Sequence, residues 1–320
     1  LTLSNVGGTA TLSADVDVTT FTVGNTVANL AFTGNGSSVT NAVTFTNDGT
    51  LTLGQDGGTQ TYNGGLTASG VGSTVTLNGT IAASDDAITF GAVTLGSNTV
   101  IDTNAAGTNT GDLTIAAVTG GSNTLTLSTE DNVANADITA SGAISGVTTL
   151  TLSNVGGTAT LSADVDVTTL SVDNTVANVA FTGNGSSVTN TISFANDGTL
   201  TLGQDGGTQT YNGGLTTTSV GGIVTLNGTI ATSNDAIVLG AVTLGSATTI
   251  DTNASSNAAD ITIAAVTGGS NTLTLTTEDN VSGADITASG AISGVTTLTL
   301  TSVGGTATLS ADVDVTTLTV

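Results

Sequence analysis

The chain has 320 residues, of which 24 are acidic and none is Lys, Arg or His, so its formal net charge is −24. A chain without cations lacks the groups that neutralise nucleic-acid phosphates and is repelled by an anionic membrane surface, so we expect no nucleic-acid partner. The absence of Cys excludes disulfides and thiolate metal sites, and no run is long and apolar enough for a transmembrane helix, so we expect no direct membrane insertion. The mean hydropathy of +0.33 distinguishes the chain from disordered proteins.

Short strand-like triplets, in which a threonine stands between two apolar residues, follow one another along the chain. They occupy residues 1–3, 21–23, 43–45, 51–53, 75–77, 93–95, 113–115 and 125–127. Residues 12–18 alternate in the same way and predict a longer strand with Leu12, Ala14, Val16 and Val18 facing inward, then a corner at residues 19–20. Because many triplets lie about 18 to 25 residues apart, the pattern predicts the coils of a solenoid.

A much longer repeat contains these triplets. The sequence LTLSNVGGTATLSADVDVTT begins at Leu1 and again at Leu150, and a close variant begins at Leu298. We divide the chain into repeat 1 (residues 1–149), repeat 2 (150–297) and the start of repeat 3 (298–320), and expect it to be a piece of a longer protein. The fold prediction is an all-β parallel β-helix, or β-solenoid, with coils of about 20 residues stacked about 4.8 Å apart inside the 149-residue repeat.

A string of tandem β-sandwich domains is the alternative fold. Asp48-Gly49 and Asn78-Gly79 each stand between strand-like segments and match the signal of a hairpin turn. The solenoid is preferred because the strands are very short and neither a buried Trp nor a tyrosine corner marks a sandwich.

Acidic residues are the candidates for chemistry. Ca²⁺ takes oxygen ligands from Asp, Asn and carbonyl groups, and eight aspartates are candidate ligands: Asp15, Asp17, Asp48, Asp56, Asp164, Asp166, Asp197 and Asp205. The Ca²⁺-binding pattern GGxGxDx is absent. Ca²⁺ is therefore a candidate cofactor on the strength of these oxygen ligands alone, and no other cofactor is expected. Three acidic pairs are candidates for hydrolytic carboxylates: Asp15 with Asp17, Asp85 with Asp86, and Glu130 with Asp131. We predict no enzyme, because no His or Lys can serve as a base and no Arg can orient an acidic sugar.

Two segments resemble known surface proteins. GTLTLGQDGGTQTYNGGL (residues 49–66, recurring at 198–215) resembles the strand repeats of autotransporter passenger domains. Residues 124–153 resemble the repeats of filamentous-haemagglutinin-like adhesins and other giant β-strand-repeat surface proteins. The resemblance implies secretion, a right-handed parallel β-helix and an adhesive or fibre-forming role.

We therefore expect an extracellular, bacterial-type cell-surface protein that forms a fibre or filament by self-association. The alternative is the stalk of a large adhesin, which contacts other cells or surfaces through a tip outside this segment; the flanking sequence would separate the two. A minor alternative is ice binding through arrays of Thr-x-Thr, such as Thr9-x-Thr11 and Thr50-x-Thr52. Uneven spacing of these arrays from coil to coil counts against it.

Overall fold

The protein is an all-β solenoid. A computed structural model describes residues 1–104, 111–130, 133–278 and 281–320, and in these residues every regular element is a strand and none is a helix. The chain makes about 15 turns with coils about 21 residues apart, and the described strand pairings are parallel. The predicted solenoid is therefore confirmed, and the tandem-sandwich alternative is wrong because it requires antiparallel hairpins.

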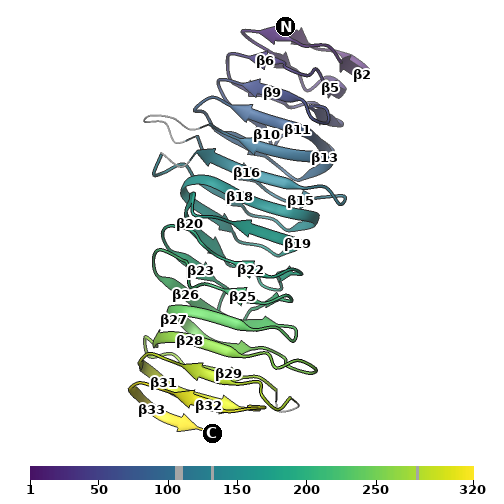
Figure 1. Cartoon of the computed structure of the whole chain (residues 1–320). Coiled ribbons are helices and arrows are strands. Elements are labelled where there is room, and N and C mark those ends of the chain that lie inside the picture. The colour runs from purple at the N-terminus through teal and green to yellow at the C-terminus, as the bar shows by residue number, and fades with distance from the viewer. Residues whose placement is uncertain (105–110, 131–132, 279–280) are drawn as a thin grey trace. The chain divides into compact units, whose positions relative to one another are not determined.

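The chain forms two compact units, Leu1–Ser162 with Thr175–Ala177 (unit 1) and Ala163–Asn174 with Asn178–Val320 (unit 2). The strands of unit 1 are β1 (Thr2–Leu3), β2 (Val6–Leu12), β3 (Asp17–Val18), β4 (Thr22–Val23), β5 (Val27–Phe32), β6 (Ser38–Val39), β7 (Val43–Thr44), β8 (Leu51–Leu53), β9 (Thr59–Tyr62), β10 (Leu66–Ala68), β11 (Val75–Ala83), β12 (Ile88–Phe90), β13 (Val93–Asp102), β14 (Leu113–Ile115), β15 (Val118–Thr119), β16 (Leu125–Glu130), β17 (Ile138–Ala140) and β18 (Ile144–Leu161). The strands that lie wholly or partly in unit 2 are β19 (Val165–Val172), β20 (Val176–Phe181), β21 (Ser187–Val188), β22 (Ile192–Ser193), β23 (Leu200–Leu202), β24 (Thr208–Tyr211), β25 (Leu215–Thr216), β26 (Val224–Thr232), β27 (Ile237–Asp251), β28 (Ile261–Thr267), β29 (Leu273–Thr276), β30 (Ile286–Ala288), β31 (Ile292–Thr301), β32 (Ala307–Leu309) and β33 (Val313–Thr319). Figure 1 shows strands of successive turns lying beside one another within each unit.

Each turn of unit 1 has three sides, which one turn of the chain illustrates. β10 lies on the first side, residues 75–77 of β11 on the second, and residues 80–83 of β11 on the third. Each segment pairs with its own partners in the turns before and after: β10 with β7 and β12, the start of β11 with β8 and β13, and the end of β11 with β9 and β13. Three parallel ladders therefore run through the unit.

Inward-facing aliphatic side chains form the core of the first side. Leu66 aligns with Ile88, Leu113 and Ile138 in successive turns, and each of these side chains is at most 2% exposed. Burying such a side chain stabilises the fold by about 1.5–3 kcal/mol. Because each one rests on its counterpart in the next turn, the stack requires no ion pair or disulfide.

Glycine at left-handed positions turns the chain between sides. Gly79 has a φ of 63°, and an added Cβ would collide with the carbonyl oxygens of Gln55 and Gly58. Asn78-Gly79 is therefore a corner inside β11, where the ladder register shifts, and not the hairpin that the tandem-sandwich alternative requires.

The expected uninterrupted strand over residues 12–18 is also wrong. β2 ends at Leu12 and β3 begins at Asp17, and Ala14 is exposed at the bend instead of facing the core. In repeat 2 the same bend separates β18, which ends at Leu161, from β19, which begins at Val165.

A buried polar pair interrupts the aliphatic core of unit 1. The Tyr62 hydroxyl donates to Gln60 Oε1 at 3.0 Å, while Gln60 Nε2 donates to the carbonyl oxygens of Phe32 at 2.9 Å and Gly34 at 3.3 Å. Both side chains are at most 1% exposed. Buried polar groups are tolerated when hydrogen-bonded, and Gln209 with Tyr211 repeats the arrangement in unit 2.

Candidate functional surface

On the first side of unit 1, the middle residues of the strand triplets form a threonine ladder. In successive turns its positions are Thr2, Thr22, Thr44, Thr67, Thr89, Thr114, Thr139 and Thr160. All eight side chains are exposed or half-buried, whereas their apolar neighbours from Leu66 to Ala140 are buried. The strand alternation thus places one hydroxyl per turn on the surface, about 4.8 Å from the next.

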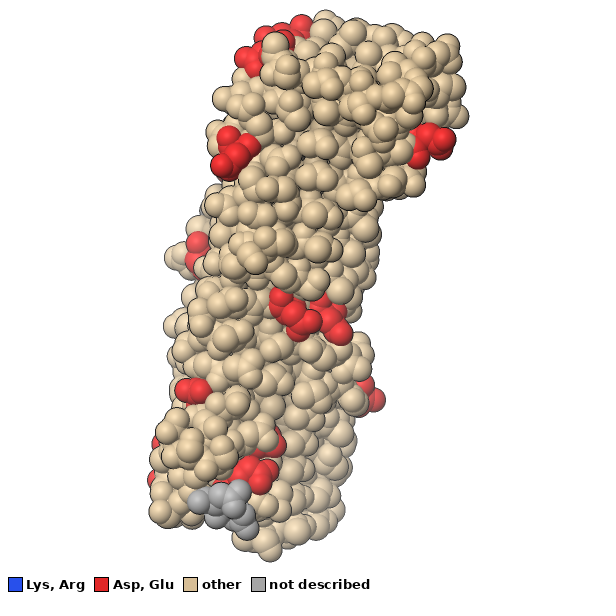
Figure 2. Space-filling model, turned by 90° about the vertical axis from the view of Figure 1, so that its right-hand side faces the viewer, with Lys and Arg blue, Asp and Glu red and all other residues tan. Residues whose placement is uncertain are grey.

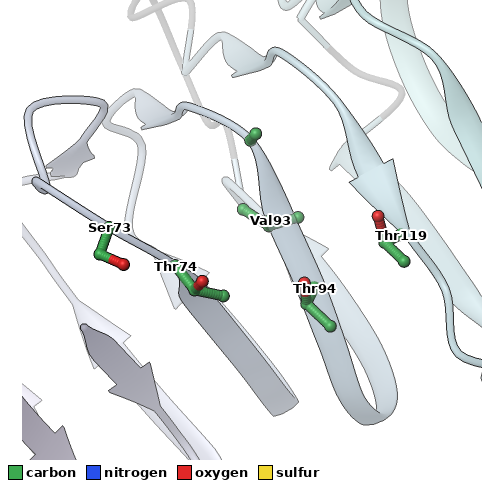
Figure 3. A pocket seen from close by; sticks show the side chains of 6 residues that line it. Ser73, Thr74, Val93, Thr94 and Thr119 are labelled. Atoms are coloured by element: carbon green, nitrogen blue, oxygen red, sulfur yellow. The ribbon is translucent and has the colours of Figure 1, made fainter. Parts of the chain in front are cut away.

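A second ladder occupies the second side. Its positions are Thr11, Ala31, Thr52, Thr76, Thr94, Thr119 and Ser145. A shallow hollow of roughly 390 Å³ lies beside it, lined by Ser73, Thr74, Ala92, Val93, Thr94 and Thr119. Figure 3 shows the side chains of Thr94 and Thr119 on neighbouring strands at this hollow. Its labelled side chains are hydroxyl and aliphatic groups, which offer no acid, base or nucleophile of unusual reactivity.

The third side carries two aligned rows. One row holds Asp17, Ser38, Thr61, Ala82, Asp102, Ser128 and Ser153. The other is mostly threonine and holds Thr59, Thr80, Val100, Thr126 and Thr151. Asp17 Oδ1 accepts a hydrogen bond from the backbone N–H of Ser38 at 3.1 Å, and Asp102 Oδ1 accepts one from the N–H of Asn104 at 3.0 Å. The Asp17 bond therefore joins successive turns, whereas the Asp102 bond is local to its own turn.

Most acidic residues described in unit 1 lie on this third side or at its corners. Asp17, Asp102 and Glu130 are in third-side strands; Asp15, Asp56, Asp85, Asp86, Asp112 and Asp137 are at the corners that flank it. Asp48, which lies between the first and second sides, is the exception among the described acidic residues of this unit. Figure 2 shows the acidic side chains in small, separate groups on a surface that has no basic residue.

Some corner carboxylates join successive turns. Asp112 Oδ1 accepts from the backbone N–H of Asp137 at 3.0 Å, and Asp137 Oδ1 accepts from the N–H of Thr158 at 2.7 Å. Asp260 and Asp285 repeat this chain of hydrogen bonds in unit 2. These acidic residues therefore contribute to coil stacking.

The eight predicted Ca²⁺ ligands are distributed over several corners. Asp15 and Asp17 lie near each other in sequence, but Asp15 is at the bend before β3 while Asp17 is within it. Asp48 and Asp56 are exposed at different corners, and Asp164, Asp166, Asp197 and Asp205 occupy the equivalent places in repeat 2. Across residues 1–104, 111–130, 133–278 and 281–320, no three His, Cys, Asp or Glu residues come together as a metal-binding group. Specific Ca²⁺ binding by these aspartates remains a prediction.

The described members of the acidic pairs that are candidates for hydrolysis lie at corners or in third-side strands. Asp85 and Asp86 are half-buried at a corner, and Asp131 lies outside the described residues. In unit 2, burial raises the pKa of the Asp251 carboxyl. A hydrogen bond that this carboxyl accepts from the Asn253 N–H opposes the rise. Asp251 is the repeat-2 equivalent of Asp102 and aligns with Thr276 in the next turn.

The fold and surface define the class of protein: a parallel β-solenoid whose sides carry ladders of small polar residues. No protein-family model, curated protein or solved structure matches the chain. Among the described residues, no helix has the length and apolar character needed to cross a membrane. The sequence predicts outward Thr-x-Thr arrays, but the single aligned row on the first side was missed, although the central Thr of triplets such as residues 113–115 carried the signal.

Proposed function

We propose that this chain is an extracellular structural repeat protein that forms a cell-surface fibre or filament and has no enzymatic role. The observation that supports the proposal most is the self-stacking core, in which each turn provides the template for the next. Such quasi-one-dimensional architecture extends by adding repeats, because each coil contacts only its neighbours. A surface of threonine ladders and separated carboxylates suits a filament better than a catalytic centre.

Immunogold labelling of intact source cells with an antibody against this segment tests the proposal. We expect gold particles along surface filaments, and filaments should disappear when the coding region is deleted. Labelling confined to the cell interior would overturn the proposal. Adhesion of the purified segment itself to cells would instead favour the adhesin alternative.

The first-side threonine ladder makes ice binding a second candidate, because the ladder aligns one Thr per turn and removes the objection of uneven spacing. However, the paired Thr-x-Thr array on the second side is broken, since Thr9 aligns with Asn29. The first side therefore keeps a single row of hydroxyl groups, and the remaining row on the second side is itself interrupted by Ala31. Measurement of thermal hysteresis decides the matter, and we expect none.

A further inference from the structure

The opening segment of the repeat occurs three times in the chain, and in two of these copies it is bound by the closing segment of the repeat before it. Residues 150–161 pair in parallel with β16 and β17 in unit 1. Residues 298–309 pair in the same register with β29 and β30 in unit 2. The same two sequences therefore bind each other at two junctions, and each junction lies within one unit.

The first copy of the opening segment, residues 1–12, presents the same binding edge to solvent. Leu1 is 47% exposed, whereas its equivalent Leu150 is 0% exposed. Leu12 is half-buried, whereas its equivalent Leu161 is 0% exposed. The other edge of this segment is covered, because β2 pairs with β5. An aliphatic edge that is buried at both internal junctions is therefore uncovered here.

A glycine of the opening segment keeps the space that a closing segment fills. An added Cβ at Gly156 would collide with the carbonyl oxygen of Val133, and one at Gly304 would collide with that of Val281. At the equivalent Gly7, an added Cβ would meet nothing within 4 Å. The first copy therefore has room for a closing segment at the place where the other two copies hold one.

Backbone hydrogen bonds to an aspartate fix the register at both internal junctions. Asp137 Oδ1 accepts from the N–H of Thr158 at 2.7 Å, and Asp285 Oδ1 accepts from the N–H of Thr306 at 2.6 Å. Thr9 holds the equivalent donor in the first copy. A closing segment bound to residues 1–12 would place its aspartate at that N–H, so the partner is specified by its sequence as well as by its shape.

A second copy of this chain carries a closing segment in β29 and β30, and its own residues 298–320 cover that segment. These residues form the last coil, in which Leu318 is 51% and Val320 is 91% exposed. End coils open at a lower free energy than interior coils. Residues 1–23 have almost the same sequence as residues 298–320. The two coils differ at three positions: Ser4 and Thr301, Asn5 and Ser302, and Phe21 and Leu318.

We propose that this chain joins a second copy head to tail by coil exchange: residues 1–23 of one copy displace residues 298–320 of the other and bind its β29 and β30. Exchange of an identical element between copies is a low-cost route to association. The exchanged coil is covered on both edges, and the released coil regains chain entropy. As the way in which filament subunits join, this inference rests on the proposed filament role.

Disulfide cross-linking between copies tests the exchange, since the chain has no native Cys. Thr299 aligns with Thr274 within one chain, so Thr2 of a second copy should take its place. Adjacent ladder positions lie about 4.8 Å apart, which a disulfide can span. After warming to just below the melting transition, a mixture of Thr2→Cys and Thr274→Cys chains should form a linked heterodimer. Thr2→Cys mixed with Thr287→Cys is the register control and should form none.

A locked chain tests whether the last coil has to open. A disulfide between Thr274→Cys and Thr299→Cys in one chain holds residues 298–320 in place. This chain should stay monomeric in sedimentation velocity when oxidised and should form head-to-tail oligomers after reduction.

Gly7→Ala tests the contact itself. The substitution has space in the single chain, so the free energy of unfolding should stay unchanged. In the exchanged pair its Cβ would collide with the Val281 carbonyl oxygen of the other copy, as at Gly304, so the oligomers should be lost. Gly70→Ala, whose Cβ would meet its nearest atom at 3.8 Å, is the matched control and should assemble as the unaltered chain does.

Equal cross-linking in the two mixtures, assembly of the oxidised locked chain or assembly of Gly7→Ala chains would overturn the exchange, and so would an unaltered chain that stays monomeric after warming. Immunogold labelling reports separately on the filament role, because labelled surface filaments can be present even when purified chains do not exchange coils. Failure of the two proposals is therefore distinguishable.

Discussion

The two tyrosines offer a direct test of the solenoid core. Tyr62 and Tyr211 are the only tyrosines of the chain, and each is at most 1% exposed. Burial raises the pKa of both phenols well above the ordinary value of 10.0, because the phenolate would lose its hydration. When the pH is raised, both phenols should therefore stay neutral for as long as the protein remains folded.

The size of the effect follows from linkage. The pKa of each tyrosine is higher in the folded state than in the unfolded state. Its contribution to the free energy of unfolding is therefore fully present below about pH 10 and is lost as pH rises. At about pH 12 the unfolded state gains about 2.7 kcal/mol from each ionised tyrosine, or about 5 kcal/mol from both. The solenoid should therefore unfold cooperatively in alkali, and ionisation should accompany unfolding.

The assay follows tyrosinate absorbance and the circular dichroism of the strands in one pH titration. We expect the absorbance to stay flat past the ordinary phenol pKa and then to rise together with loss of the strand signal. Protein in strong denaturant is the control and should titrate near pH 10. Tyr62→Phe should halve the final amplitude. A smooth, reversible rise near the ordinary pKa with the strand signal intact would refute the burial of these rings.

Four further outcomes follow from the structure. Tyr62→Phe leaves the buried Gln60 Oε1 without its donor, so it should lower the free energy of unfolding by about 1–3 kcal/mol in denaturant melts. Gly64→Ala should lower the free energy of unfolding by a similar amount, about 1–3 kcal/mol, because the added Cβ would collide with the backbone of the preceding coil. Gly7→Ala is the control: its Cβ would meet nothing within 4 Å, so the substitution should be nearly neutral. Asp251 should contribute stability that rises as pH falls from about 7 toward 4, because its raised folded pKa favours proton uptake by the folded chain; thermal melts across this range measure the contribution, and a weakening seen in Ca²⁺ buffer but not with a chelator would point to aspartates acting as metal ligands. Melting temperature should rise with NaCl, and an additional rise with Ca²⁺ at equal ionic strength that a chelator reverses would establish specific sites.

The strands and the coil architecture were predictable because the sequence signal is local. The predicted triplets at 51–53 and 113–115 coincide with β8 and β14, and the alternation of apolar residues with Thr places the apolar members inward. Coil spacing was also visible, since ladder partners such as Val75 and Val93 lie 18 residues apart and Leu113 and Ile138 lie 25 apart. Short strands joined by variable corners retain this pattern in the sequence.

The positions of the corners were harder to predict. Ala14 continues the apolar alternation of residues 12–18, yet the chain bends there and leaves its side chain exposed. Asn78-Gly79 has the composition of a hairpin turn, although its left-handed glycine serves a corner between parallel strands. In both cases the position of the corner depends on how residues of adjacent turns align, and a single sequence does not contain that information. The clustering of acidic residues near one side of unit 1 was hidden for the same reason.

Equivalent segments of repeats 1 and 2 lie on different sides of unit 1, and the interchangeability of the three sides explains why. Leu3 aligns with Val23 on the first side, whereas its repeat equivalent Leu152 aligns with Leu127 on the third. Both arrangements place aliphatic side chains of similar volume in contact, which a packed core tolerates well. Because each coil interacts only with adjacent coils, a duplicated segment has to fit its neighbours at the junction and need not restore the original side. The core therefore sets no requirement that two copies of one sequence lie on the same side of the solenoid.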